Sequence, residues 1–143
     1  MAISNINSLS LDPSGGFPAS ATATVATSQS TTSASYTDLA TAGPAVTVTT
    51  GTKALVIVTS RMLNNLSTYN SYMGFAVSGA SSVAASDDSA YWIANPSTTR
   101  ASMVVLQTGL TAGSNIFTAK YKAEASSTAH YERRTITVID MGS

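Results

Sequence analysis

The sequence contains no cysteine, so neither disulfides nor a thiolate metal site can hold the chain together. Charged residues are also scarce: they make up 10% of the 143 residues, against about 25% in an average soluble domain. Seven basic and seven acidic residues give a formal net charge of zero, which disfavours a nucleic-acid partner because such binding normally needs a basic surface. So few charges suit a protein that buries much of its surface in a fixed assembly.

Long apolar runs are missing as well. No run approaches the roughly 20 residues that cross a bilayer, so the sequence predicts no membrane partner. The first residues lack the basic and apolar regions of a secretory signal. No segment keeps an apolar stripe at helical period for three turns, which argues against long helices.

What is present is a series of short strand patterns. The run Leu55-Val56-Ile57-Val58 holds four apolar residues, three of them β-branched, and favours a strand buried on both faces. The turn at 50–52 predicts that the flanking strands pair antiparallel. The expected strands cover residues 36–39, 45–49, 53–62, 71–78, 90–94, 102–107, 115–122 and 132–139.

These strands predict an all-β fold: an antiparallel β-sandwich of about eight strands, jelly-roll-like, over residues 34–143. A Greek-key sandwich of another strand order would give the same pattern, and the absence of a fixed repeat argues against a β-helix. Alternation predicts which side chains face the core, namely Met73, Phe75, Val77, Phe117, Ala119, Tyr121, Ile136 and Val138. Trp92 is also expected in the core.

Residues 1–33 differ from the rest and predict an extended N-terminal arm. Residues 19–33 are almost entirely Ala, Ser and Thr, a composition that cannot easily offset its own ordering entropy. The segment is either a flexible tail or an arm that orders on a neighbouring subunit. The second alternative is favoured by apolar residues that a plain linker would not need, and these are the predicted partner-binding residues: Ile3, Ile6, Leu9, Leu11 and Phe17.

No motif in the sequence carries catalytic chemistry. His130 is the only histidine and no Gly-x-Ser-x-Gly surrounds any serine, so we expect no enzyme activity and no catalytic residue. The pair Asp87-Asp88 could contribute to a calcium site or could be a solvated turn, and the second interpretation is preferred because a calcium site recruits more oxygens than this loop offers. No cofactor and no metal ligand are predicted.

Two further groups could contact a partner. Lys120, Lys122, Arg133 and Arg134 would form one basic face if the last two strands paired, either as a salt-bridged solvent face or as an ion-pair belt between subunits. Tyr69 lies in a polar Asn/Ser/Thr loop and is the aromatic residue best placed to contact a partner or a glycan.

The segment from Ser35 to Val56, SYTDLATAGPAVTVTTGTKALV, resembles one common in tailed-bacteriophage structural proteins. In these, a Tyr-x-Asp-Leu start leads through a Gly-Pro break to two strands ending in Ala-Leu-Val. The similarity resumes at 73–78 and in the last strand. It implies either a capsid decoration (cement) protein or the distal domain of a tail fibre, both typically trimeric β-sandwiches, and it transfers no functional residue.

The short N-terminal segment and the absence of a collagen-like or heptad repeat favour the decoration protein. We therefore expect a homotrimer on the outer surface of the virion head, made in the host cytoplasm, with the major capsid protein as its partner. A receptor-binding tip of a tail fibre is the alternative.

Overall fold

The computed structural model describes residues 17–143, which form two antiparallel sheets packed face to face. Sheet A contains β1 (Ser20–Val25), β2 (Gln29–Thr31), β4 (Ala54–Asn64), β7 (Thr99–Gln107) and β9 (Ala129–Asp140). Sheet B contains β3 (Ala45–Thr50), β5 (Ser71–Gly79), β6 (Ala90–Ile93) and β8 (Gly113–Ala123). The 3₁₀ turn η1 (Asp87–Ser89) precedes β6. The predicted all-β antiparallel sandwich is therefore confirmed.

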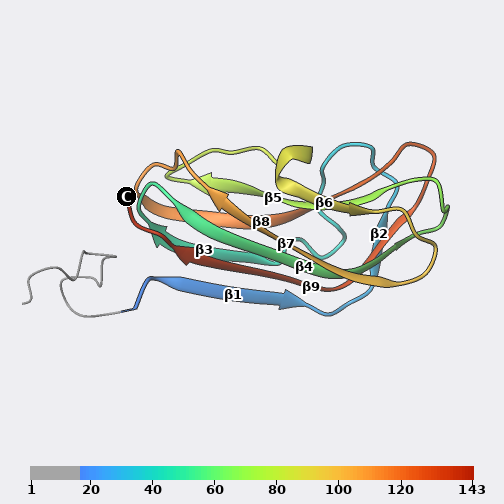
Figure 1. The fold of residues 1–143 in the computed structure, drawn as a ribbon, viewed down its shortest axis with the longest axis horizontal. Coiled ribbons are helices and arrows are strands. Elements are labelled where there is room, and N and C mark those ends of the chain that lie inside the picture. The colour runs from blue at the N-terminus through green and yellow to red at the C-terminus, as the bar shows by residue number, and fades with distance from the viewer. Residues whose placement is uncertain (1–16) are drawn as a thin grey trace, which may run out of the picture.

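The strand order is that of a jelly roll. Sheet A runs β1-β9-β4-β7, with the short β2 also paired with β9, and sheet B runs β3-β8-β5-β6. Figure 1 shows β1, β9, β4 and β7 following one another across sheet A, so β7 forms one edge of that sheet. From β2 onward, every connection crosses from one sheet to the other except the one between β5 and β6, which are neighbours in sheet B.

The prediction that the strands flanking the 50–52 turn pair with each other is wrong. β3 pairs with β8 in sheet B, whereas β4 pairs with β7 and β9 in sheet A. A short connection can also step between the two layers of a sandwich, so its length alone does not specify a hairpin. The strand expected at 36–39 is reduced to one antiparallel bridge between Thr37 and Tyr121.

The core lies between the sheets and contains the side chains that alternation predicts. The rings of Phe75 and Phe117, on neighbouring strands of sheet B, have centroids 6.4 Å apart, and the tilted rings of Tyr121 and Tyr131 have centroids 4.8 Å apart. All eight core residues expected from alternation are buried. The expectation that the run Leu55–Val58 is buried on both faces is wrong. Val56 and Val58 are buried, whereas Leu55 and Ile57 are only half-buried, because the described residues of this two-layer sandwich leave the outer face of sheet A uncovered.

The expected arm at residues 1–33 differs from the structure over its second half. β1 pairs with β9 from Ser20 to Val25, and β2 extends this contact from Gln29 to Thr31. These residues form an edge of sheet A in their own chain, so the sandwich begins before residue 34. Hydrogen bonds to β9 satisfy the backbone of this segment, which therefore orders without large side chains. Amino-acid composition alone does not reveal this backbone pairing. Residues 1–16 lie outside the described part of the chain.

A β-bulge in β9 reverses which residues face the core. Thr59 opposes Thr135 and Arg61 opposes Glu132, so the single residue Ser60 stands against both Arg133 and Arg134. Arg133 adopts a positive φ of 48° at this point. The extra residue shifts the alternation by one, which is how a β-bulge re-aims a side chain. As a result Arg134 points into the protein.

Replacing Arg133 by glycine is expected to stabilise the protein by up to about 1 kcal/mol, because glycine adopts positive φ without a Cβ penalty. Arg133 is exposed, so little packing is lost. Urea unfolding of the two proteins measures the difference. Glycine at the neighbouring His130, whose φ is not positive, is the control and should destabilise. A loss of stability on replacing Arg133 would contradict the expectation.

Candidate functional site

The outer face of sheet A carries a cluster of apolar side chains that no other part of the described chain covers. Leu55 of β4 lies between Leu106 of β7 and Ile139 of β9, and Ile57 lies beside Val104. Val104 and Leu106 are 59% and 52% exposed. We call this cluster the apolar strip, and its members are Leu55, Ile57, Val104, Leu106 and Ile139.

Beyond the apolar strip, this face continues as uncharged hydroxyl pairs. Thr22 and Thr137 lie 2.8 Å apart through their Oγ1 atoms, Thr24 and Thr135 lie 3.0 Å apart, and Thr59 meets Ser102 at 2.6 Å. These hydroxyls satisfy one another across the strands and leave little unpaired polarity. A surface of this kind can lose its water at low electrostatic cost.

Charged side chains of the same face lie at its opposite end. Arg61 forms an ion pair with Glu132 at 2.8 Å, and Arg100 opposes Arg61 in the pairing of β4 with β7. The face thus grades from an apolar end through hydroxyls to a charged end. An apolar area bordered by polar groups is a common feature of contact surfaces between proteins.

The outer face of sheet B carries a different feature, a polar cavity of about 480 Å³. It lies between the segment at 34–36, the loop at 84–87 and the β8 residues Lys120 and Lys122. This depression is open to solvent over most of its extent, unlike the enclosed clefts that bury most of a small ligand. Lys120 forms an ion pair with Asp38 at 2.8 Å, which joins the segment before β3 to the outer face of β8.

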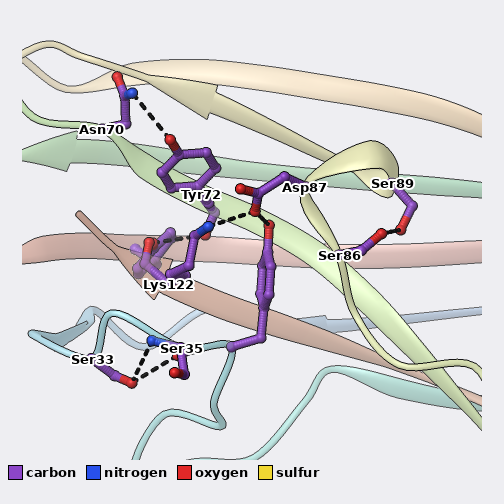
Figure 2. A network of polar contacts seen from close by, with 10 residues as sticks. Ser33, Ser35, Asn70, Tyr72, Ser86, Asp87, Ser89 and Lys122 are labelled. Atoms are coloured by element: carbon purple, nitrogen blue, oxygen red, sulfur yellow. Dashed lines mark hydrogen bonds and ion pairs between the residues drawn. The ribbon is translucent and has the colours of Figure 1, made fainter. Parts of the chain in front are cut away.

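Lys122 is the centre of a polar network at this cavity (Figure 2). Its Nζ atom donates a hydrogen bond to Oδ1 of Asp87 at 2.5 Å and lies 4.1 Å from the ring centroid of Tyr72 and 5.1 Å from that of Tyr36. Tyr36 also donates to the same carboxylate oxygen, at 2.9 Å. The ammonium therefore lies against two aromatic rings, as a cation–π contact requires.

The network shifts the pKa of Asp87 and the pKa of Tyr36 in opposite directions. The hydrogen bond from Lys122 lowers the pKa of Asp87, so this carboxylate stays ionised. Burial raises the pKa of Tyr36, and its hydrogen bond to Asp87 raises it further, so the phenol stays protonated. The cluster presents fixed donors and acceptors at neutral pH and offers no group poised for proton transfer.

Replacing Asp87 by asparagine is expected to destabilise the protein by less than about 1 kcal/mol at pH 7, because the pair is exposed to solvent and screened. Since folding lowers the pKa of Asp87, its contribution is present above the unfolded carboxyl pKa of about 4 and is lost as the pH falls through the lower folded value. Urea unfolding of both proteins at pH 7 and at about pH 2 should show the difference at pH 7 only. Asp88→Asn is the control, and an equal loss there would contradict the prediction.

Aromatic side chains lie beside this network. Tyr72 opposes Trp92 on one side and Lys122 on the other, and Trp92 is 57% exposed. The expectation that Trp92 belongs to the core is wrong, because β6 is a short edge strand and its alternation turns Trp92 outward. An exposed indole beside a tyrosine, polar groups and a cavity can hold a ring-shaped polar ligand such as a sugar.

His130 shows no catalytic arrangement within the described residues. It lies opposite Leu63 and Ser30 and lines a second cavity of about 350 Å³ with the Arg61–Glu132 pair. In residues 17–143 no three His, Asp or Glu side chains are grouped so that they could hold a metal ion. No helix of the same part of the chain is long and apolar enough to cross a bilayer.

The structure places two of the six predicted partner-binding residues. Phe17 is 94% exposed, at the start of the described part of the chain. Tyr69 is half-buried in the loop after β4, where its amide donates to the carbonyl of Leu66 at 3.3 Å. Among the described residues, no hydrogen bond joins Phe17 or Tyr69 to a residue of the apolar strip. Ile3, Ile6, Leu9 and Leu11 lie outside the described residues.

The predicted basic face does not form. β8 and β9 lie in different sheets, so Lys120 and Lys122 are on the outer face of sheet B, whereas Arg134 is buried. Sequence reasoning also missed the apolar strip. Its signal was present in residues 103–106, which are apolar on both faces of one strand.

Comparison of the sequence with models of protein families and with curated proteins finds no match.

Proposed function

We propose that this protein is a bacteriophage capsid decoration protein that binds the outer surface of the head. The observation that carries the proposal is the outer face of sheet A, where the apolar strip and the paired hydroxyls form a broad surface with few charges. The resemblance of residues 35–56 to tailed-phage structural proteins supports the same role. The capsid surface is the proposed partner, and the virion head the proposed location.

The proposed mechanism is burial of surface. A decoration protein stabilises a shell by covering junctions between capsid subunits, and its contribution grows with the apolar area that it removes from water. Val104 and Leu106 offer such area already in the folded chain. The resemblance implies a homotrimer, whereas the free edge of β7 leads below to a dimer, and the mass of the protein in solution decides between the two.

Co-sedimentation tests the proposal. The purified chain is mixed with heads of the encoding phage from which the protein has been removed, and bound protein is quantified by gel. We expect saturable binding at hundreds of copies per head, as icosahedral symmetry requires, on the order of ten times more than a tail component would reach. Binding to tails alone, or no binding to heads, would contradict the proposal.

The truncation that separates the N-terminal segment from the sandwich must stop before β1. Removing residues 1–33 would delete β1 and β2 and expose the edge of β9. Removing residues 1–16 leaves every described strand in place. If the segment binds the shell, the shorter truncation should remain folded and lose affinity for heads, whereas unchanged affinity would exclude that role.

A receptor-binding tip of a tail fibre is the second candidate, and the cavity at Lys122 with the exposed Trp92 supports it. In that case the isolated chain should bind a glycan, and Trp92→Ala should abolish binding while leaving the fold intact. Glycan-array binding measures this. A chain that binds heads but no glycan would remove this candidate.

A further inference from the structure

β7 has the sequence of an interior strand but lies at an edge of sheet A. Its residues 103–106 are all apolar, so both faces of the strand are apolar. Val104 and Leu106 point outward and are more than half exposed, while Met103 and Val105 point toward the core and are only partly buried. Strands that are apolar on both faces are normally covered on both faces. Within the described chain, β7 is not covered on both faces.

The backbone of β7 has one partner strand. Its residues pair with β4, and among residues 17–143 no backbone hydrogen bond joins β7 to any other segment. Nine residues without proline, and with Arg100 as the only charge, thus present a free edge. Natural proteins protect such edges with charges, prolines or bulges, because an open edge accepts another strand.

We infer that β7 pairs antiparallel with β7 of a second copy of this chain, about a two-fold axis at Val104. In this register Val104 opposes its own equivalent, Ser102 opposes Leu106, and the residues at 101–107 of both copies overlap. Each side chain keeps its face, so the apolar strips of the two copies join across the axis.

Charge and size both fit a second copy. The overlap contains no charged residue, because Arg100 lies just outside it, and a neutral edge meets its own copy without repulsion. Seven residues of strand extend about 24 Å and form about seven inter-strand hydrogen bonds. The area covered is well below the roughly 800 Å² per partner of a standard complex, so we expect association at about micromolar concentration.

Sedimentation equilibrium of the full chain tests the inference. Between about 1 and 500 µM the mass should rise from 14.6 kDa toward twice that value. Val104→Lys should weaken association at least tenfold, because it sets two like charges directly opposite each other. Thr47→Lys, on the outer face of edge strand β3, is the matched control and should associate like the wild type.

A mixture of two variants makes the test specific for the axis. Val104→Glu should also be monomeric, and an equal mixture of Val104→Lys and Val104→Glu should associate again, because opposite charges then face each other. Circular dichroism confirms that each variant is folded. A wild-type chain that stays monomeric throughout, a trimer, or a mixture no more associated than its components would overturn the inference. Binding to phage heads is scored separately, so the two proposals fail independently.

Discussion

Replacing Arg134 by methionine is expected to destabilise the protein by about 3 kcal/mol. The guanidinium is fully buried and donates to the carbonyls of Thr41 and Gly43 and to the side chain of Gln29, at 2.9 to 3.3 Å. It also lies 5.3 Å from the ring of Tyr121. Methionine has a similar length but no donors, so these buried acceptors would lose their partners. Thermal unfolding should show a melting temperature lower by roughly 10 °C.

Two further variants separate lost hydrogen bonds from lost charge. Arg134→Lys keeps the charge but cannot reach several acceptors at once, so it should lose most of the same stability. Arg100→Met removes an exposed arginine from β7 and should change stability by less than about 0.5 kcal/mol. If Arg134→Met were as stable as the wild type, Arg134 would not organise the segments around it.

Replacing Asn115 by alanine is expected to cost about 2 to 3 kcal/mol. Its fully buried amide accepts a hydrogen bond from the backbone N–H of Ser81 at 2.8 Å and donates to Oγ1 of Thr50 at 2.9 Å and to the carbonyl of Thr111 at 3.0 Å. One side chain thereby ties β3 and two loops to β8. Urea unfolding measures the loss of stability.

The neighbouring Ser114→Ala is the control for Asn115. Ser114 is exposed on the same strand and its side chain makes no recorded hydrogen bond in the described residues, so its replacement should be nearly neutral. Equal effects of the two substitutions would show that the amide network contributes nothing beyond an ordinary strand position.

The fold class was predictable because it follows from local patterns. Alternation at Met73, Phe75 and Val77, and again at Phe117 and Tyr121, assigns the core faces, since successive strand residues point to opposite sides. Sheet membership was not predictable in this way, because the turn at 50–52 looks the same whether it joins paired strands or crosses between layers. The bulge at Arg133 also cannot be seen in a period of two, so the burial of Arg134 was missed.

The candidate surfaces were only partly accessible from the sequence. Residues 103–106 signalled a strand covered on both faces, and only the structure shows that β7 lies at an edge. The cavity network joins Tyr36, Asp87 and Lys122, which are distant in the chain and meet through the pairing of β5 with β8 and the loop before β6. No spacing rule in the sequence could anticipate that meeting.

The central claim is that the outer face of sheet A is the surface through which this protein assembles. Because the chain has no cysteine, single-cysteine variants can be labelled at one chosen site. Ser102→Cys reports on the outer face of sheet A and Thr47→Cys on that of sheet B. The measurement is the rate of maleimide labelling on the free chain and on particles that carry it. The account predicts that particles protect the cysteine at 102 and leave the one at 47 reactive. Equal labelling at 102 in both states, or protection at 47 alone, would contradict it.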